Sequence, residues 1–259
     1  MSAKHALLPL ALVIGIGVAI VWLLPQSENA ITGPAIALVL NTDCSSSMRG
    51  VLSPLREPAA RITEDATRPG SLLAAGTFPS ASGQNDTPWA VVDRYRLDVR
   101  ATGGNRRKAL ERIKAQGRRN AAGVRNLLNC PLGFRGGSPL FSALEDCAAV
   151  LRDGHLPQTT SRRVVLFTDA AIVGDGIDAR RGIRPAQADA VIARVSPQLA
   201  GLRGAKIWVI GAGSGTDVDR RTFVTIRRMI ERLATKVGAQ LMSFGSSASG
   251  YPAALASKR

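Results

Sequence analysis

Short apolar runs and longer amphipathic stretches alternate along most of this chain. Runs of apolar residues typical of buried strands occur at residues 36–40, 164–168, 206–211 and 240–244. Stretches with apolar residues three or four apart predict helices at residues 55–67, 105–128, 140–154, 186–202 and 218–237. Strands that alternate with helices in this way predict an α/β fold over residues 35–245, with a doubly wound, mostly parallel central sheet and helices on both faces.

The first part of the chain has a different pattern. Residues 6–24 form an uninterrupted apolar run, and no charged residue occurs between His5 and Glu28. A run of this length can cross a bilayer, whereas the apolar core of a cleaved signal peptide is only about 7–15 residues long. Residues 27–30 make a poor cleavage site. We therefore expect one transmembrane signal anchor at residues 6–24, with a cleaved signal peptide as the alternative.

The charges beside this apolar run predict its orientation. Lys4 and the amino terminus precede the run, and the next basic residue is Arg49. Positive charge favours the cytoplasmic side of a span. Residues 1–5 are therefore expected in the cytoplasm and the domain outside it. Residues 25–34, which contain Pro and Gly, are expected to be a tether, and residues 246–259 a C-terminal tail.

The chain as a whole is strongly basic, with 34 Lys and Arg against 19 Asp and Glu and a formal charge of +15. Residues 105–128 are its most basic part, and Glu111 is the single acid there. The candidate patch for an anionic surface comprises Arg106, Arg107, Lys108, Arg112, Lys114, Arg118 and Arg119. A solvated helix face is the ordinary explanation of such a run. The alternative is a surface that binds anionic lipid or nucleic acid.

A group of oxygen-bearing side chains follows the first predicted strand. Asp43, Ser45 and Ser47 stand at alternate positions directly after it, so in an extended loop their side chains project to one side. The carboxyl end of a central strand is where open α/β sheets bind ligands. One carboxylate and two hydroxyls suit a hard cation such as Mg²⁺ or Mn²⁺, which requires further oxygen ligands from other loops. The alternative is that these residues only cap the next helix.

Three segments together resemble the metal-ion-dependent adhesion site (MIDAS) of the von Willebrand factor A (vWA) domain family. Residues 43–48 match the D-x-S-x-S motif, residues 136–140 match G-G-T-x-L with Ser138 in place of Thr, and residues 167–169 contain T-D. The resemblance implies a vWA-like sheet. It also implies a cation that is ligated by Ser45, Ser47 and Ser138, with Asp43 and Asp169 acting directly or through water. Ala170 stands where the family commonly has Gly, which affects the shape of that loop.

The three cysteines have no zinc-binding spacing. If the domain lies outside the cytoplasm, a disulfide becomes feasible, and Cys130 with Cys147 is the candidate pair because it would close a loop that carries Ser138. The alternative is that both are buried as small hydrophobic residues. Cys44 is expected to be the unpaired cysteine.

The sequence favours a binding protein over an enzyme. His5 and His155 are its two histidines, so a Ser-His-Asp triad would depend on His155 alone. The leading hypothesis is a membrane-anchored vWA-like module whose Mg²⁺ or Mn²⁺ is completed by an Asp or Glu of a partner protein. The alternative is a basic adaptor for nucleic acid or anionic lipid, with a structural or inactive metal site.

Overall fold

The computed structural model describes residues 33–78, 91–131, 133, 136–157, 160–214 and 218–252. The chain divides into a unit of residues 1–33 and a unit of residues 34–259. The expected cytoplasmic residues 1–5, the span at residues 6–24 and most of the tether lie outside the described residues. Within the described ranges, no helix is both long enough and apolar enough to cross a bilayer.

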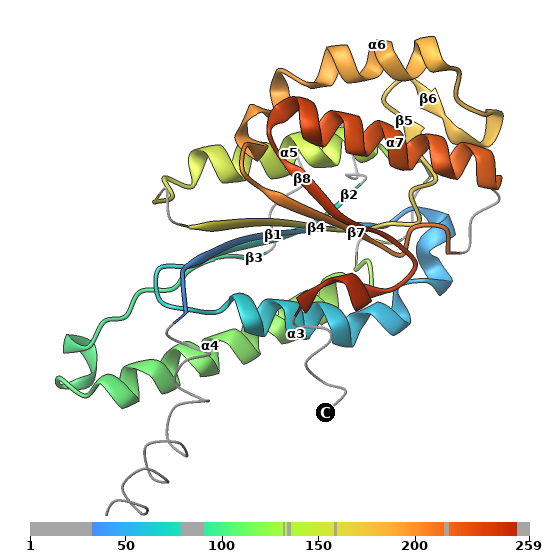
Figure 1. Ribbon diagram of the computed structural model, residues 1–259. Coiled ribbons are helices and arrows are strands. Elements are labelled where there is room, and N and C mark those ends of the chain that lie inside the picture. Colours follow the sequence, from blue (N-terminus) through green and yellow to red (C-terminus); the bar gives the residue numbers. More distant parts are fainter. Residues whose placement is uncertain are drawn as a thin grey trace, which may run out of the picture. The chain divides into compact units, whose positions relative to one another are not determined.

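A six-stranded sheet forms the centre of the second unit (Figure 1). Its strands in spatial order are β3 (Val91–Arg94), β2 (Leu72–Phe78), β1 (Ile36–Asp43), β4 (Ser161–Phe167), β7 (Lys206–Ile210) and β8 (Gln240–Gly245). All neighbouring strands are parallel except β3, which runs antiparallel to β2 at one edge. The expected mostly parallel, doubly wound sheet is confirmed.

Helices cover both faces of the sheet (Figure 1). One face carries α5 (Leu140–Asp153), α6 (Pro185–Val195) and α7 (Arg220–Val237), and the other carries α3 (Arg56–Ala66) and α4 (Arg106–Leu127). Strand β1 is buried along its whole length because alternate side chains point to the two layers. Ala37 and Val39 belong to the core beneath α5, whereas Leu38 and Leu40 belong to the core above α3.

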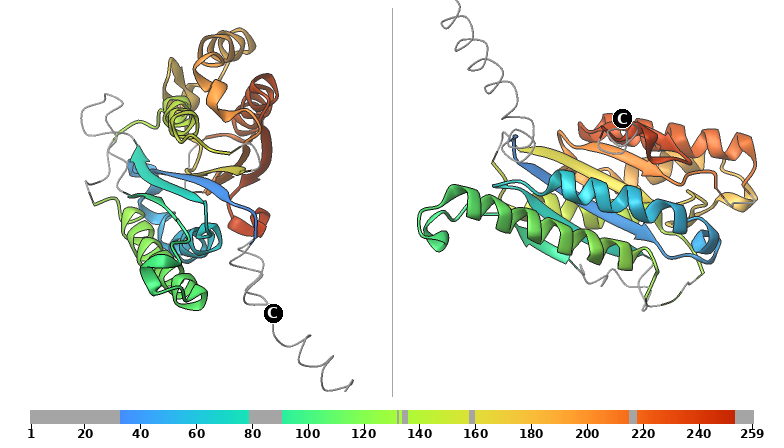
Figure 2. Two further views of the ribbon diagram at one scale, coloured as in Figure 1. Left: turned by 90° about the vertical axis from the view of Figure 1, so that its left-hand side faces the viewer. Right: turned by 90° about the horizontal axis from the view of Figure 1, so that it is seen from below.

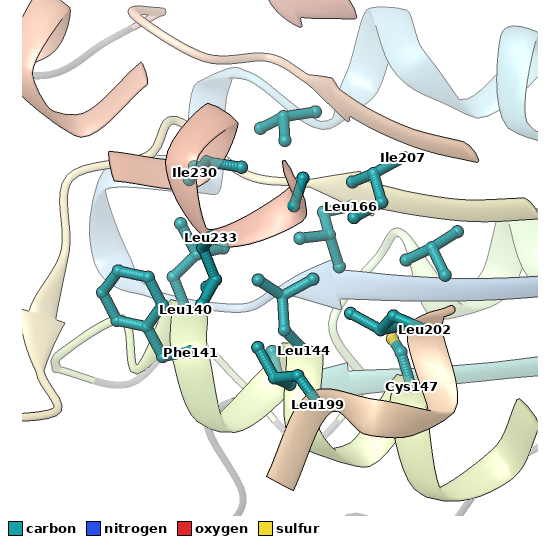
Figure 3. Packing of buried hydrophobic residues seen from close by; sticks show 14 of the residues in the cluster. Leu140, Phe141, Leu144, Cys147, Leu166, Leu199, Leu202, Ile207, Ile230 and Leu233 are labelled. Carbon is teal, nitrogen blue, oxygen red and sulfur yellow. The ribbon is translucent and has the colours of Figure 1, made fainter. Parts of the chain in front are cut away.

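The larger core is a packed layer between the sheet and α5, α6 and α7 (Figure 3). Leu144 and Cys147 of α5 lie against Leu202 of the 3₁₀ helix η6 (Gln198–Leu202). η6 follows α6 after a break at Pro197, which divides the stretch of residues 186–202 that is predicted to be helical. A Cβ on Gly201 would lie only 2.0 Å from the carbonyl oxygen of Ala148, so only glycine allows η6 to pack this closely on α5.

The alternation of side chains along residues 91–99 predicts a strand over that whole stretch, but β3 ends at Arg94. Tyr95 is buried, and its hydroxyl accepts a hydrogen bond of 2.6 Å from the amide of Asn120 on α4. The chain then turns away from the sheet into the 3₁₀ helix η4 (Arg100–Thr102), where Asp98 accepts a hydrogen bond from the backbone N–H of Ala101. β3 is short because the residues that follow it pack against α4.

Helix α3 fills most of the stretch of residues 55–67 that is predicted to be helical, and Pro58 lies in its first turn. The N–H groups of a first turn have no partner within the helix, so proline costs no hydrogen bond there. At the other end of the chain, residues 246–252 pack on the sheet as part of the domain. They include the 3₁₀ helix η7 (Ala248–Gly250), and the fully buried Tyr251 lies 4.7 Å from the ring of Trp208.

The structure corrects the expected disulfide. Cys44 is bonded to Cys130, with Cα atoms 5.6 Å apart, and Cys147 is a buried free thiol. The pair Cys130 and Cys147 cannot form because the sheet lies between them. Cys130 belongs to the core on the side of α3 and α4, whereas Cys147 points from α5 into the opposite core.

Candidate metal centre

The predicted metal ligands lie at the point where the sheet reverses its winding. The connection from β1 to β2 runs through α3 on one face, and the connection from β4 to β7 runs through α6 on the other face. The chain therefore diverges above the carboxyl ends of β1 and β4, which leaves a crevice there. Asp43 is the last residue of β1, and Thr168 and Asp169 directly follow β4.

Asp43 is the hub of a buried hydrogen-bond network. Its Oδ1 accepts a bond of 2.8 Å from the backbone N–H of Ser45. Its Oδ2 accepts two bonds, one of 2.5 Å from the hydroxyl of Ser138 and one of 2.7 Å from the hydroxyl of Thr168. The carboxylate is fully buried. Three loops that are far apart in the sequence are thus joined by one side chain.

Ser45 and Ser47 follow Asp43 closely in the chain. Residues 46–50 form the 3₁₀ helix η2 (Ser46–Gly50) rather than the expected extended loop. The Oγ atoms of Ser45 and Ser47 are nevertheless 3.1 Å apart, because Ser45 has extended backbone angles just before η2 begins. Ser45 is buried, Ser47 is half-buried, and Ser46 between them is exposed. The two hydroxyls therefore form a pair that borders the surface.

Ser138 is held in place by the short hairpin of β5 (Val173–Gly174) and β6 (Ile177–Asp178). The backbone N–H of Ser138 donates to the carbonyl of Val173 at 2.8 Å, and the N–H of Val173 donates back at 3.3 Å. Asp175, at the tip of the hairpin, accepts bonds from the backbone N–H of Phe141 and the hydroxyl of Ser142 at the start of α5. The hairpin thus fixes both Ser138 and the helix that follows it.

Asp169 has one satisfied carboxylate oxygen and one orphan. Its Oδ1 accepts a hydrogen bond of 2.9 Å from the backbone N–H of Ala171. Its Oδ2 is buried and has no hydrogen-bond partner among the described residues. Buried carboxylate oxygens are almost always paired. An unpaired one at this position is the strongest sign in the structure that another atom belongs there.

Ala170 has a left-handed backbone conformation, with φ of 62°. This is the position at which the resemblance leads one to expect glycine, and the backbone adopts the conformation that glycine favours. The N–H of Ala170 donates to the hydroxyl oxygen of Thr168 at 3.0 Å. The turn is therefore kept, at the cost of placing a side chain in an uncommon backbone region.

The pKa of Asp43 is raised to about 6, chiefly by burial and to a smaller extent by the carboxylate of Asp169, although the hydrogen bonds from Ser138, Thr168 and Ser45 lower it. Two buried carboxylates that face each other without a cation repel unless one is protonated. A bound divalent cation would reverse this effect, because it favours the charged form of both. A bound divalent cation would thus offset the repulsion between the carboxylates of Asp43 and Asp169.

The donor set fits a hard cation. A hydroxyl that donates its proton to Asp43 still has lone pairs available for a metal, which applies to Ser138 and to Thr168. Two carboxylates and several neutral hydroxyl oxygens are the ligand types that Mg²⁺ and Mn²⁺ prefer. Among the described residues there is no cluster of three or more His, Cys, Asp or Glu that could hold a metal. A site here would depend on hydroxyls.

The structure brings Asp43, Ser45, Ser47 and Ser138 together and places Asp169 close enough to act on the charge of Asp43. Thr168 is not among the predicted site residues, although its hydroxyl bonds Asp43 directly. Its place at the end of a buried strand, one residue before Asp169, is the signal that could have identified it. Asp175 gives no comparable signal, because its role depends on the fold of the hairpin.

A cavity of about 980 Å³ lies on the β5–β6 hairpin, and no candidate metal ligand is among the described residues that line it. It is bounded by the β5–β6 hairpin, residues 181–184 and the first turns of α7. Gly174 is one of its lining residues and also packs against Pro139, the neighbour of Ser138.

His155 does not reach the candidate centre. It follows the end of α5, whereas Ser138 precedes the start of that helix, so about 20 Å of helix separates them. The basic patch also lies elsewhere, on α4. Of its members, Arg106, Arg107, Lys108, Arg112, Arg118 and Arg119 are exposed, and Lys114 is half-buried.

No protein-family model matches the chain, and no curated protein matches it. Among solved structures, it is similar to the pilus adhesin SpaC of Lactobacillus rhamnosus GG, with a TM-score of 0.48 and 14% identity over 86% of this chain and 29% of that one. The chain is also similar to the SpRpn10 VWA domain, with a TM-score of 0.42 and 14% identity over 83% of this chain and 90% of that one. A third similar structure is manganese-loaded TRAP protein of Plasmodium vivax, with a TM-score of 0.37 and 12% identity over 80% of this chain and 75% of that one. Similarities of this size carry no argument about function.

Proposed function

We propose that this chain is a membrane-anchored, vWA-like binding module. A Mg²⁺ or Mn²⁺ ion bound at the candidate centre would be completed by an Asp or Glu carboxylate of a partner protein. The single observation that carries the proposal is the buried Asp43 network with the orphan oxygen of Asp169 beside it. The chain's own residues hold the ion with two carboxylates and neutral hydroxyls, which leaves the ion electrophilic toward an outside carboxylate.

Each residue has a distinct part in this proposal. Ser45, Ser47 and Ser138 supply neutral oxygens, and Asp43 fixes their orientation by accepting bonds from Ser138 and from the backbone of Ser45. Asp169 supplies the second negative charge. Ser47 is the most exposed of these residues, so an incoming carboxylate is expected to approach over η2.

Binding rather than catalysis is proposed because of the composition of the centre. Hydrolytic metal sites usually combine several carboxylates or histidines with an activated water. Here hydroxyls predominate, and His155 lies beyond the far end of α5.

The anchor and the location outside the cytoplasm belong to the same proposal. Residues 6–24 provide the apolar length, and Lys4 provides the charge on the cytoplasmic side. The bond between Cys44 and Cys130 supports this location, because disulfides persist in oxidising compartments and are rare in the cytosol.

Metal binding by the full-length chain in lipid nanodiscs tests the proposal, with free Mn²⁺ measured by electron paramagnetic resonance. The double substitution Ser45→Ala/Ser47→Ala is expected to weaken Mn²⁺ binding by at least about tenfold. Ser46→Ala is the matched control, because Ser46 lies between the two and is exposed. Unchanged Mn²⁺ affinity in the double variant would refute the metal centre.

The partner is tested separately with the same discs. Proteins retained from solubilised membranes in Mg²⁺ should be released by EDTA, and the Ser45→Ala/Ser47→Ala variant should not retain them. If the double variant retains the same proteins in EDTA, binding does not pass through the metal. The alternative of a basic adaptor then takes precedence, and its binding should weaken steeply with salt.

A further inference from the structure

The first turns of α4 project beyond the sheet (Figure 2). α4 packs on the domain through Ile113, which belongs to the core, through Gly117, next to Thr67, and through Asn120, bonded to Asp93 and Tyr95. The helix begins at Arg106, so about 10 Å of it precedes Ile113. Residues 96–105 fold back along this extension, and Arg112 donates to the carbonyl of Ala101. We call residues 94–119 the basic arm.

The basic arm is densely positive. It contains ten basic residues against the acids Asp98 and Glu111. Asp98 accepts the backbone N–H of Ala101, and Glu111 forms an exposed ion pair with Lys114 at 3.4 Å. The other basic side chains therefore meet no carboxylate from within the arm, and several like charges remain close together. Such an arrangement repels itself unless an anion lies nearby.

Two hollows on the arm could hold such anions. One of about 800 Å³ is lined by four basic residues, Arg107, Lys108, Arg112 and Arg118, by the single acid Glu111, and by Thr102 and Asn105. The other, of about 550 Å³, is lined by the basic residues Arg94, Arg96, Arg112 and Arg119 and by the acids Asp93 and Asp98, so its basic residues outnumber its acids. Arginine binds phosphate oxygens through paired N–H groups, and hydroxyl and amide groups add donors. The two hollows thus suit phosphate groups spaced along a surface.

The arm lies at the same edge of the sheet where β1 begins. Arg94 pairs with Leu72 in the sheet, and Leu72 pairs with Ala37 near the start of β1 (Figure 1). The chain reaches β1 from the apolar run at residues 6–24 through residues 25–35, which can span at most about 40 Å. A bilayer that holds residues 6–24 is therefore within reach of this edge.

From this placement we infer that the basic arm binds the anionic phospholipid headgroups of the membrane that holds residues 6–24. The inference rests on the proposed membrane anchor. Nucleic acid is disfavoured as the occupant, because residues 25–35 would keep this edge close to the surface of the bilayer that holds residues 6–24. The eight residues of β1 separate the two edges of the sheet by about 26 Å. The candidate metal centre, at the carboxyl ends of the strands, would then face away from the bilayer and toward a partner.

Acetylation of lysine in full-length protein tests this inference. The chain is placed in nanodiscs of phosphatidylcholine alone, or mixed with phosphatidylglycerol, and the reaction of Lys108 with a water-soluble acetylating reagent is followed by mass spectrometry. Lys108 is exposed and lies at the first turn of α4. Its acetylation is expected to be severalfold slower in the anionic discs. At about 1 M NaCl, where the Debye length is only about 3 Å, the difference should disappear.

Two variants that keep Lys108 sharpen the test. Arg106→Gln/Arg107→Gln/Arg112→Gln should restore fast acetylation in anionic discs, because each basic residue near such a surface shifts the bound-to-free ratio by about fivefold. The matched control, Arg184→Gln/Arg220→Gln/Arg221→Gln, removes three exposed arginines at the opposite edge of the sheet and should leave Lys108 protected.

The outcomes separate this inference from the anchor on which it rests. If the chain does not co-elute with the discs, the anchor is wrong and the inference fails with it. Equal acetylation in both kinds of disc, with the chain incorporated, overturns the inference alone. An oligonucleotide that protects Lys108 equally in neutral and anionic discs, at the same salt, would make nucleic acid the occupant and would also overturn it.

Discussion

The hydroxyl of Ser138 donates a hydrogen bond of 2.5 Å to Oδ2 of Asp43, although 95 positions separate the two residues in the chain. The backbone of Ser138 is paired on both sides with Val173, so the position of its hydroxyl is set by the β5–β6 hairpin. Its proton is given to Asp43, and its lone pairs remain available to a cation. This contact is the link between the first and second loops of the candidate centre.

Two substitutions of Ser138 should distinguish the effect of its hydroxyl on metal binding from the effect of its packing. Ser138→Ala removes a neutral oxygen and a donor to Asp43, so Mn²⁺ affinity is expected to fall by at least about tenfold. Ser138→Thr keeps the hydroxyl and should bind Mn²⁺ within a few-fold of the native protein. Titration of both variants with Mn²⁺ checks this. If Ser138→Ala binds as tightly as Ser138→Thr, the hydroxyl is not a ligand.

The two glycines before Ser138 should respond differently to alanine. Gly137 has a φ of 84°, and a Cβ there would lie 3.2 Å from the carbonyl oxygen of Val173. Gly137→Ala combines left-handed strain with this close contact and should lower the free energy of unfolding by about 1–2 kcal/mol. Because it also displaces Ser138 from Val173, it should weaken Mn²⁺ binding.

Gly136→Ala is the control for this prediction. A Cβ at Gly136 would meet nothing within 4 Å, and its φ lies outside the positive range. Thermal or urea unfolding should therefore show a change no larger than about 0.5 kcal/mol for Gly136→Ala. If both variants lose the same free energy of unfolding, the loop as a whole is sensitive to substitution, and the contact of Gly137 with Val173 is not the cause.

The sequence was sufficient for the sheet because its signals are local. A continuous apolar run such as residues 36–40 is buried on both faces wherever it lies in a parallel sheet, so β1 and β4 can be identified from composition alone. The strand predicted at residues 91–99 is wrong beyond Arg94, because the contact that ends it is not local. Its alternation is real, but Tyr95 is buried by a long-range bond to Asn120, and no local pattern reports that contact.

The same distinction applies to the candidate centre. Asp43, Ser45 and Ser47 form one local motif, and their proximity follows from their spacing. The disulfide partner of Cys44 does not follow from spacing, because it depends on which face of the sheet each cysteine occupies. Cys147 has an attractive separation from Cys130 in sequence, yet it points into the opposite core.

Asp146 should make the stability of the domain depend on pH. Burial and the adjacent carboxylate of Glu145 raise the pKa of Asp146 to about 6, from an ordinary value of 3.8. Between these values the folded protein binds more protons at this residue than the unfolded chain does. This contribution to stability is therefore fully present below about pH 4 and is lost as the pH rises through about 6.

Asp146→Asn removes the charge that is unfavourable at neutral pH. The variant should be more stable than the native protein at pH 8, by about 1 kcal/mol once solvent screening of this half-buried group is taken into account, and equally stable at pH 4. Urea unfolding at both pH values measures this. Asp153→Asn, at the exposed end of the same helix, is the control and should change stability little at either pH. An equal gain at pH 4 and pH 8 for Asp146→Asn would contradict the assigned cause.

The bond between Cys44 and Cys130 should stabilise both the domain and its candidate metal loop. It joins residues separated by 86 positions, and closure of a loop of that length corresponds to about 4.5 kcal/mol in the chain-entropy model. Cys44 lies between Asp43 and Ser45, so the bond also fixes that loop to the end of α4. Cys130→Ser should therefore lower the free energy of unfolding by up to this amount and weaken Mn²⁺ binding as well.

Cys147→Ala is the control, because Cys147 is a free thiol buried in the other core and only a small packing loss of about 1 kcal/mol is expected. The pairing itself is read from peptides of unreduced full-length protein. A peptide containing Cys44 should be joined to one containing Cys130, and reduction should lower stability as much as Cys130→Ser does. A peptide that joins Cys130 to Cys147 would contradict the described packing, since the sheet would have to part for those two sulfur atoms to meet.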